Sequence, residues 1–280
     1  MEKTLKNKDF SKVPPPEAEG FREAFTLHLA DNALILAQRI AEWCGHGPVL
    51  EQDIAITNIS LDLVGQSRLF YQYAAELINQ STNKPINLAT EDSLAYLRTE
   101  REFKNCLLVE QPNGDWAQTI LRQFFFSQYQ FLLFQQLREN NPDSYRDEQL
   151  AAIAIKSLKE VTYHLRWSSE WVIRLGDGTE VSHNRMKKAL DELWRYTGEM
   201  FIPVDYEKEI YIDFNKIKEE WDIKVNTVLN EASLIPPPTG GGGGAAFMQT
   251  GGKKGIHTEH MGFLLAEMQY LQRTYPGSEW

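Results

Sequence analysis

Apolar residues recur at steps of three and four positions through most of this chain, which is the period of one face of an α-helix. In the segment 116–137, Phe residues occur on several sides of the predicted helix, so we expect that helix to be buried all round. The fold class that the pattern predicts is all-α. The expected helices cover residues 17–46, 50–80, 91–106, 116–137, 144–175, 179–201, 214–234 and 258–273.

Proline-rich and glycine-rich segments separate the predicted helices and divide the chain. Consecutive prolines at positions 14–16 stop any helix from extending further back, so residues 1–20 are expected to form an N-terminal arm. Residues 236–252 combine prolines with a run of glycines, which favours an exposed, flexible loop. Residues 21–280 are expected to form one ferritin-like domain, a four-helix bundle with additional C-terminal helices packed against it.

Composition narrows the class of protein. Apolar residues make up 42% and charged residues 24%, as in ordinary globular proteins. The net charge of −10 argues against a nucleic-acid partner, because phosphate binding needs clustered Lys and Arg. No apolar run approaches the ~18 residues of a membrane span, and the first residues do not resemble a signal peptide. We therefore expect a cytoplasmic protein with no membrane partner.

The chain has two cysteines, Cys44 and Cys106. Two are too few for a disulfide framework or a thiolate metal cluster, which agrees with a reducing compartment. Both are expected to be small core residues.

A bundle of four long helices can hold a buried di-iron site, in which two helices each supply a Glu and the other two each supply a Glu-x-x-His motif. Carboxylates and imidazoles suit iron and leave coordination positions open for oxygen. Here Glu42 stands among apolar residues of the first long helix, and Ser127 stands at the approximate carboxylate position of the third. In the fourth helix only His164 matches, because Val161 replaces the required Glu. On the residues alone, Glu42 is more readily explained as half exposed at a helix end.

Two Glu-x-x-x-His pairs offer a different metal hypothesis. Glu42 with His46, and Glu160 with His164, are each four positions apart, so each pair would share a helix face. Two such pairs facing each other would bind one zinc ion. The spacing is common by chance, and His46 lies in a Gly-His-Gly-Pro helix stop, so the metal-free interpretation is favoured.

Without a metal, the inward polar side chains must bond to one another or to trapped water, since unpaired buried polar groups are costly. One arrangement that meets this requirement is a protonated His164 beside Glu42. The polar positions expected to point inward are Gln38, Glu42, Gln66, Gln123, Ser127 and His164.

Several ordered sequence blocks carry a family resemblance. Residues 107–114 read LLVEQPNG, residues 251–260 read GGKKGIHTEH, and the further blocks are 41–46, 61–66, 163–166 and 265–273. Together they resemble the C-subunit family of the bacterial ring-1,2-phenylacetyl-CoA epoxidase, a multicomponent oxygenase of phenylacetate catabolism. The resemblance covers residues 26–280 and leaves out the arm and the polyglycine run.

The resemblance also implies which residues of the second long helix stand at iron-ligand positions. Residues 62–66 resemble the Asp-Glu-Ala-Gly-His run of the iron-binding catalytic subunits, which puts Leu63 in place of a ligand Glu and Gln66 in place of a ligand His. Leucine cannot coordinate a metal, and glutamine is a poor, uncharged substitute for imidazole. The vestigial di-iron positions are then Glu42, Leu63, Gln66, Ser127, Val161 and His164.

By this resemblance the chain is a non-catalytic structural subunit. It implies pairing with the di-iron catalytic A subunit, which epoxidises phenylacetyl-CoA, and with other subunits of the complex. It also implies that this chain binds no metal or cofactor, and that NADPH, FAD and a 2Fe-2S cluster belong to a separate reductase component. The alternatives are an independent metal-dependent helical-bundle oxidoreductase that uses a reduced Glu/His site, and an iron-storage or scaffold protein.

Two lysines beside flexible glycines are candidate functional contacts. Lys253 and Lys254 are placed to touch the phosphates of CoA or an acidic surface of a partner protein. The favoured alternative is that both form a solvated basic turn.

Overall fold

The computed structural model describes residues 16–81, 88–139, 147–208, 210, 212–238 and 247–278. Every regular element in these ranges is a helix, so the predicted all-α fold class is confirmed. None of the helices described is both long and apolar enough to cross a bilayer. Residues 1–15 of the predicted arm and 239–246 of the predicted loop lie outside the described ranges, and residues 16–20 of that arm already belong to the first helix.

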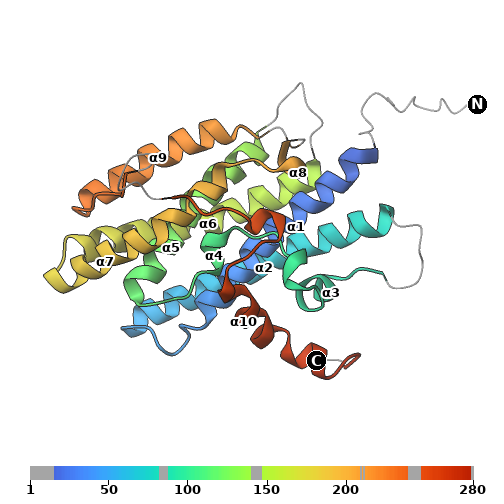
Figure 1. Cartoon of the computed structure of the whole chain (residues 1–280), viewed down its shortest axis with the longest axis horizontal. Coiled ribbons are helices and arrows are strands. Elements are labelled where there is room, and N and C mark those ends of the chain that lie inside the picture. Colours follow the sequence, from blue (N-terminus) through green and yellow to red (C-terminus); the bar gives the residue numbers. More distant parts are fainter. Residues whose placement is uncertain are drawn as a thin grey trace, which may run out of the picture.

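Four long helices form the centre of the molecule (Figure 1). Helices α1 and α2 pack together along their length, α5 and α6 do the same, and α2 contacts α6 between the two pairs. This is the ferritin-like arrangement that the sequence predicts. The bounds are Pro16–Ala41 for α1, Leu50–Ser81 for α2, Trp116–Arg138 for α5 and Glu148–Gly176 for α6.

Helix α5 is buried on all sides, as the distribution of its Phe residues predicts. Helix α6 covers one side of it, and α7 (Glu180–Leu193) and α9 (Phe214–Glu231) cover others. The Phe125 ring lies 5.6 Å from the Trp221 ring, and the Trp221 indole N–H donates to the Phe125 carbonyl oxygen at 3.0 Å. The prediction that the later helices pack against the bundle is therefore confirmed for α7 and α9.

Helix α1 ends at residue 41, earlier than predicted, because the following turn is held by the start of α2. The chain turns through Gly45, whose φ is 79°. Asp53 accepts hydrogen bonds from the backbone N–H groups of Gly45 at 3.1 Å and Gly47 at 3.0 Å, and these bonds lower the pKa of its carboxyl. This turn leaves Cys44 exposed, so the expectation that it is a core residue is wrong.

The prediction of one helix over residues 91–106 is wrong beyond its first turns. The structure has α3 (Glu91–Tyr96), a short 3-10 helix (Glu100–Glu102) and then α4 (Leu107–Glu110). The interruption turns the side chain of Arg98 into the protein, where it is buried. Cys106 immediately precedes α4 and is buried as expected.

Asp31 of α1 is fully buried and accepts hydrogen bonds from several directions. Arg98 donates two guanidinium hydrogen bonds to its carboxylate, the Tyr71 hydroxyl donates one at 2.5 Å, and the Lys104 backbone N–H donates one at 2.8 Å. Burial by itself lowers the pKa of Arg98, but the Asp31 carboxylate reverses this effect and raises it overall. The cluster joins α1, α2 and the segment between α3 and α4.

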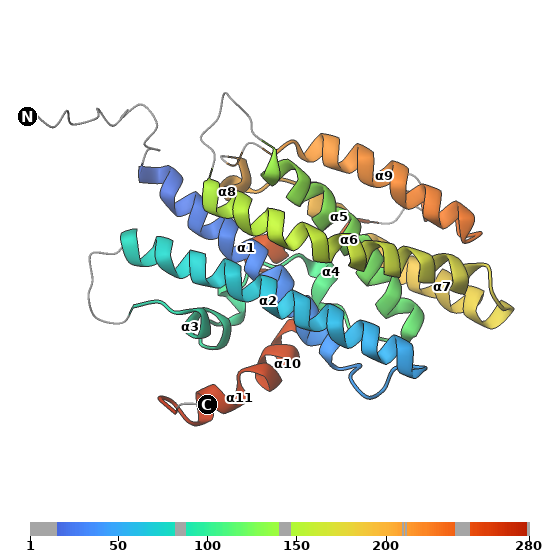
Figure 2. The same ribbon diagram turned by 180° about the vertical axis from the view of Figure 1, so that it is seen from behind.

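The last helices contact the bundle only in part. In α10 (Glu259–Met268), the predicted apolar positions Met261, Leu264 and Leu265 are buried. Leu271 belongs to the separate α11 (Tyr270–Thr274) and is 47% exposed, so the prediction that it docks on the body is wrong. Both views show α10 and α11 projecting from the side of the bundle (Figure 1, Figure 2).

We expect Asp31→Ala to lower the free energy of unfolding by about 3–5 kcal/mol, because it leaves the buried Arg98 guanidinium unpaired. The double change Asp31→Leu with Arg98→Met is expected to cost less than the single change. Urea unfolding followed by circular dichroism measures both. The control is Lys188→Ala, which removes a mostly exposed ion pair with Glu192 worth at most about 1 kcal/mol. An Asp31→Ala effect no larger than the control's would contradict this account.

Candidate functional site

Two pairs of side chains connect α2 to α6 in the middle of the bundle. The Gln66 amide donates to a Glu160 carboxylate oxygen at 2.8 Å, and His164 Nε2 lies 3.0 Å from a carboxylate oxygen of Asp62. Gln66 lies four residues after Asp62 on α2, and its partner Glu160 lies four residues before His164 on α6. The two pairs are therefore one helical turn apart on antiparallel helices. Gln66 and His164 are buried, so both pairs reach into the core.

Helix α5 adds further polar groups to the core. The Gln130 amide donates to the Gln66 amide oxygen at 3.0 Å, and the Gln123 amide donates to the Ser127 hydroxyl at 2.8 Å. All four of these side chains are buried. We call the buried side chains Gln66, Gln123, Ser127, Gln130 and His164, with their partners Asp62 and Glu160, the polar layer.

The polar layer does not fit a di-iron centre. Leu63 and Val161 are fully buried aliphatic side chains at two of the positions that the sequence predicts to be vestigial, and Ser127 supplies a neutral hydroxyl at a third. A di-iron centre in this fold takes carboxylates at these positions, and their charge offsets that of the metal ions. Across the described ranges, no group of three or more His, Cys, Asp and Glu side chains is arranged to hold a metal ion.

The structure separates Glu42 from the polar layer. Its carboxylate lies beyond the end of α1, is 36% exposed, and accepts hydrogen bonds from Arg39 at 3.1 Å and Asn113 at 2.8 Å. The predicted contact between His164 and Glu42 is therefore wrong, because α1 ends at Ala41 and Glu42 lies in the turn that follows it. His164 pairs with Asp62 instead.

The two-pair zinc hypothesis also lacks structural support. Glu42 and His46 follow the end of α1, so they do not share a helix face. Glu160 and His164 do share α6, but each is bonded to a different side chain of α2.

Several polar atoms of the layer are buried without a protein partner. They are Nδ1 of His164 and the amide oxygens of Gln123 and Gln130. Such buried atoms are commonly bonded to ordered water. Gln38, which the sequence predicts to point inward, is only half-buried.

A second polar cluster lies where the LLVEQPNG and GGKKGIHTEH blocks meet. The fully buried Glu110 carboxylate lies 2.7 Å from His257 Nδ1, and accepts from the Thr258 N–H at 2.6 Å, the Thr258 hydroxyl at 2.7 Å and the Asn105 amide at 2.9 Å. His257 Nε2 lies 3.0 Å from the Phe103 carbonyl oxygen. An acceptor lies at each ring nitrogen, an arrangement that favours the imidazolium form of His257. Burial alone lowers the pKa of His257, but its bond to Glu110 and the nearby negative charge raise it overall.

Glu199 holds the start of the same segment. Its carboxylate accepts from the Leu107 N–H at 2.8 Å and the Gly251 N–H at 2.7 Å, and burial raises its pKa although these bonds oppose the rise. A Cβ atom at Gly252 would lie 2.3 Å from the Asn105 backbone oxygen, so the close packing there requires glycine. The sequence predicts that Gly251 and Gly252 end a flexible loop, whereas the structure packs them against the body.

Lys253 is buried rather than solvated. Its ammonium donates to both carboxylate oxygens of Glu207 at 3.0 Å, and to the carbonyl oxygens of Met200 at 3.1 Å and Ile202 at 3.3 Å. The expectation of a solvated basic turn is therefore wrong for Lys253, whose side chain has no free surface for a partner or for CoA. Lys254 is exposed, so it alone of the two candidates faces solvent.

His28 of α1 lies beside this ion pair and is neutral. Its Nε2 is 3.7 Å from the Glu207 carboxylate, and its Nδ1 is 2.7 Å from the Lys104 carbonyl oxygen. Burial and the positive charge of Lys253 lower the pKa of His28 to about 3. Glu207 belongs to α8 (Asp205–Lys208), which packs on α1.

Three buried carboxylates, those of Glu110, Glu199 and Glu207, thus hold residues 251–258 on the body. We call residues 251–258 the C-terminal strap. Loss of the strap would remove the Lys253 ammonium from Glu207, His257 and Thr258 from Glu110, and the Gly251 N–H from Glu199, which is energetically costly for carboxylates in the interior. Because α10 follows directly, the strap also sets where the projecting helices leave the bundle.

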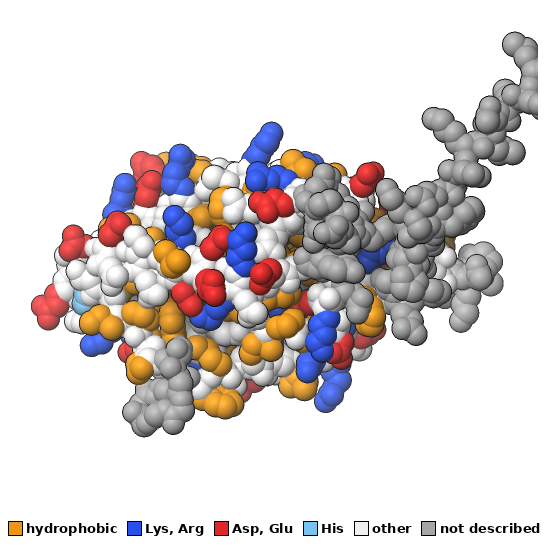
Figure 3. All heavy atoms as spheres, turned by 90° about the horizontal axis from the view of Figure 1, so that it is seen from above, with side chains coloured by type: hydrophobic (Ala, Val, Ile, Leu, Met, Phe, Trp, Pro, Cys, Tyr) orange, Lys and Arg blue, Asp and Glu red, His pale blue; other side chains and the backbone are white. Residues whose placement is uncertain are grey.

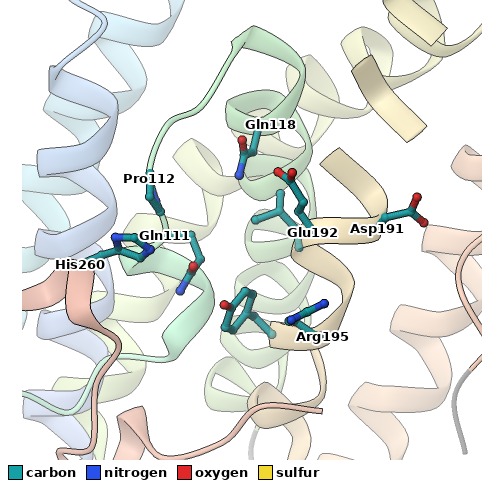
Figure 4. A pocket seen from close by; sticks show the side chains of 9 residues that line it. Gln111, Pro112, Gln118, Asp191, Glu192, Arg195 and His260 are labelled. Atoms are coloured by element: carbon teal, nitrogen blue, oxygen red, sulfur yellow. The ribbon is translucent and has the colours of Figure 1, made fainter. Parts of the chain in front are cut away.

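A surface hollow of about 380 Å³ lies beside the strap (Figure 4). It lies between the loop after α4, the end of α7 and the start of α10, and its lining includes Gln118, Glu192, Arg195 and His260. Acidic, basic and amide side chains are mixed in it. It therefore lacks the clustered cations that the phosphates of CoA would need.

Positive and negative side chains are also mixed on the face of the molecule that Figure 3 shows. The face in Figure 3 carries Lys and Arg side chains interspersed with Asp and Glu, with small hydrophobic areas between them. Nucleic-acid binding needs a patch dominated by positive charge, which this face does not show.

Sequence reasoning missed Asp62, Glu110 and His257 as members of the buried clusters. The signal for Glu110 was present, because it is a lone charged residue after three apolar residues in LLVEQPNG. Asp62 lies one helical turn before Gln66, which puts both on one face of α2. No local pattern shows which residue from another segment pairs with each of them.

The fold and the polar layer first define a class: a ferritin-like helical bundle whose described residues include no group of three or more His, Cys, Asp and Glu side chains arranged to hold a metal ion. The sequence matches the family described as phenylacetic acid catabolic protein over residues 13–280, and the chain belongs to that family. It is similar to the C subunit of 1,2-phenylacetyl-CoA epoxidase from Escherichia coli (strain K12), with 48% identity over 263 residues, which cover 92% of this chain and 98% of that protein. The resemblance seen in the sequence blocks is thereby confirmed.

Restoring a single ligand position is expected to destabilise the bundle. Leu63→Glu would bury a carboxylate while Val161 and Ser127 still supply none, so we expect the free energy of unfolding to fall by about 3–5 kcal/mol. Leu63→Met keeps the volume and is expected to cost at most about 1.5 kcal/mol. Urea unfolding with and without ferrous iron tests both variants. Recovery of Leu63→Glu by iron would show that the layer still accommodates the metal.

The hold on the strap is expected to weaken as the pH rises through the raised pKa of His257. Because the folded pKa lies above the ordinary value of 6.5, the pairing with Glu110 contributes fully below pH 6.5 and is lost above the raised pKa. Hydrogen exchange of the Thr258 N–H, corrected for intrinsic rates and measured from about pH 6 to about pH 10, reports this loss.

Two variants serve as controls for that measurement. Glu110→Gln removes the charge that His257 pairs with and is expected to abolish the pH dependence. His46→Ala changes an exposed histidine and is expected to leave the pH dependence of exchange unchanged. If Glu110→Gln keeps the pH dependence of the parent protein, the dependence does not come from this pair.

Proposed function

We propose that this chain is a non-catalytic structural subunit of a phenylacetyl-CoA epoxidase, the ring-epoxidising monooxygenase of phenylacetate catabolism, and that it acts in the cytoplasm. It pairs with the di-iron catalytic A subunit and supports it within a larger complex. NADPH, FAD and the 2Fe-2S cluster belong to the reductase component. The observation that carries this proposal is that Leu63, Ser127 and Val161, at the positions expected for iron ligands, are buried side chains that supply no carboxylate.

The distribution of apolar surface supports a role in assembly. Phe263 in α10, and Tyr270 and Tyr275 in and after α11, are exposed aromatic side chains on the helices that project from the bundle. Aromatic residues of this kind are frequent anchors of protein interfaces. The buried strap holds these helices in a defined position, as a contact between subunits requires.

The alternative of an independent metal-dependent oxidoreductase has less support. It needs Glu160 and His164 as ligands, and both are engaged with side chains of α2. Iron storage would need the same missing carboxylates. Lys254 remains a prediction as a contact to the phosphates of CoA or to an acidic partner surface, since its side chain is exposed.

Reconstitution tests the proposal directly. The purified chain is expected to co-elute with the catalytic subunit and, once the reductase is added, to support epoxidation of phenylacetyl-CoA with NADPH and oxygen. Without the catalytic subunit we expect no product, and metal analysis of the chain alone should show no stoichiometric iron. Light scattering after size exclusion measures assembly, and mass spectrometry measures product. Product formed by this chain and the reductase alone would overturn the proposal.

A further inference from the structure

The turn before α5 contains the one Asn-Gly dipeptide of the chain, at Asn113 and Gly114. An Asn side chain that precedes glycine is prone to lose ammonia spontaneously, because glycine has no side chain to hinder attack by its backbone nitrogen. Gly114 has a φ of 56°, in the left-handed region that favours glycine, so the geometry of the turn retains this reactive dipeptide. Gly114 is also exposed, which gives water access to the site.

The side chain of Asn113 is held at both of its polar atoms. Its amide nitrogen donates to the Arg39 carbonyl oxygen at 2.6 Å and to a Glu42 carboxylate oxygen at 2.8 Å. Its amide oxygen accepts from the Arg122 guanidinium. The Thr119 hydroxyl donates to the Asn113 backbone oxygen at 3.0 Å. The contacts therefore come from the end of α1, the turn that follows it, and α5.

Loss of ammonia requires these contacts to break. In that reaction the Gly114 nitrogen bonds to the side-chain carbonyl carbon of Asn113, and the bond from that carbon to the amide nitrogen breaks. The amide nitrogen takes up the proton that the Gly114 nitrogen loses and leaves as ammonia. Water then opens the cyclic imide at either carbonyl, which gives aspartate or isoaspartate.

The present partners of the amide nitrogen oppose this departure. The nitrogen can leave only by giving up its bonds to the Arg39 carbonyl and the Glu42 carboxylate, and a hydrogen bond to a charged acceptor is among the stronger ones. The leaving nitrogen also needs a proton donor, whereas both of these groups are acceptors.

We propose that Asn113 is a latent site of spontaneous deamidation, and that its contacts with Arg39, Glu42 and Arg122 restrain the reaction in the folded protein. Glu42 is the weakest of these restraints, because it is 36% exposed and follows the end of α1. The aspartate product carries a carboxylate where the amide now donates to Glu42, so the two like charges repel each other and loosen the contact between α1 and the turn before α5. This inference does not depend on the proposed function.

The rate of deamidation at Asn113 tests the inference. The purified chain is incubated at mildly alkaline pH, and mass spectrometry of its proteolytic peptides locates the conversion, while an isoaspartate methyltransferase assay measures one of the products. We expect slow conversion in the folded parent protein and fast conversion in the same chain unfolded in urea. Glu42→Ala removes one charged acceptor, so conversion is expected to be at least about tenfold faster than in the folded parent.

Two further variants act as controls. Glu42→Gln keeps an acceptor oxygen without the charge, and its rate is expected to lie between those of the parent and Glu42→Ala. Glu170→Ala removes a comparable exposed ion pair, with Arg174, at a distant part of α6, and is expected to deamidate at the parent rate. Circular dichroism under the incubation conditions shows whether each variant is folded.

Three results would overturn the inference. The first is an equal rate for the folded parent and folded Glu42→Ala. The second is a rate in the folded parent as high as in urea, which would mean that the contacts give no restraint. The third is the absence of conversion at Asn113 in the unfolded chain, which would mean that the dipeptide is not reactive.

Discussion

Buried carboxylates hold separate segments of this chain together, because each buried charge needs a partner inside the protein. The partners come from distant parts of the sequence, so every pair joins separate segments. Together with the hydrogen bonds of Glu199, these pairs orient the strap and the segment between α3 and α4 on the bundle. The ion pairs are Asp31 with Arg98, Glu207 with Lys253, and Glu110 with His257.

The polar layer is built in a different way from these ion pairs. Its contacts with α5 are between amides and a hydroxyl, and Leu63 and Val161 add only aliphatic surface. A layer of this kind keeps the helices in register without needing a metal to offset charge. The polar layer and the ion pairs share no residue, and in general the fold of a protein and its site are separable.

The surface of the protein exposes apolar side chains that are candidates for contact with a partner. Apolar side chains are exposed along α2 and on the projecting helices α10 and α11, where a self-contained bundle would place polar residues. The strap links these observations, since the same buried carboxylates that hold it on the body also fix the exit of α10. In this protein, buried carboxylates and their partners fix the position of the projecting helices, and the proposed function depends on the exposed surface.

The sequence alone determined the helical fold, because helix periodicity and caps are local properties. The four long helices lie near their predicted positions, and Asp115 caps α5 by accepting from the Gln118 N–H. It also determined that Leu63 cannot bind a metal, since that follows from the residue type. Only the tertiary structure decided that His164 pairs with Asp62 and not with Glu42, and that Lys253 is buried against Glu207. Those outcomes depend on contacts between residues far apart in the chain, and no local pattern encodes which of them meet.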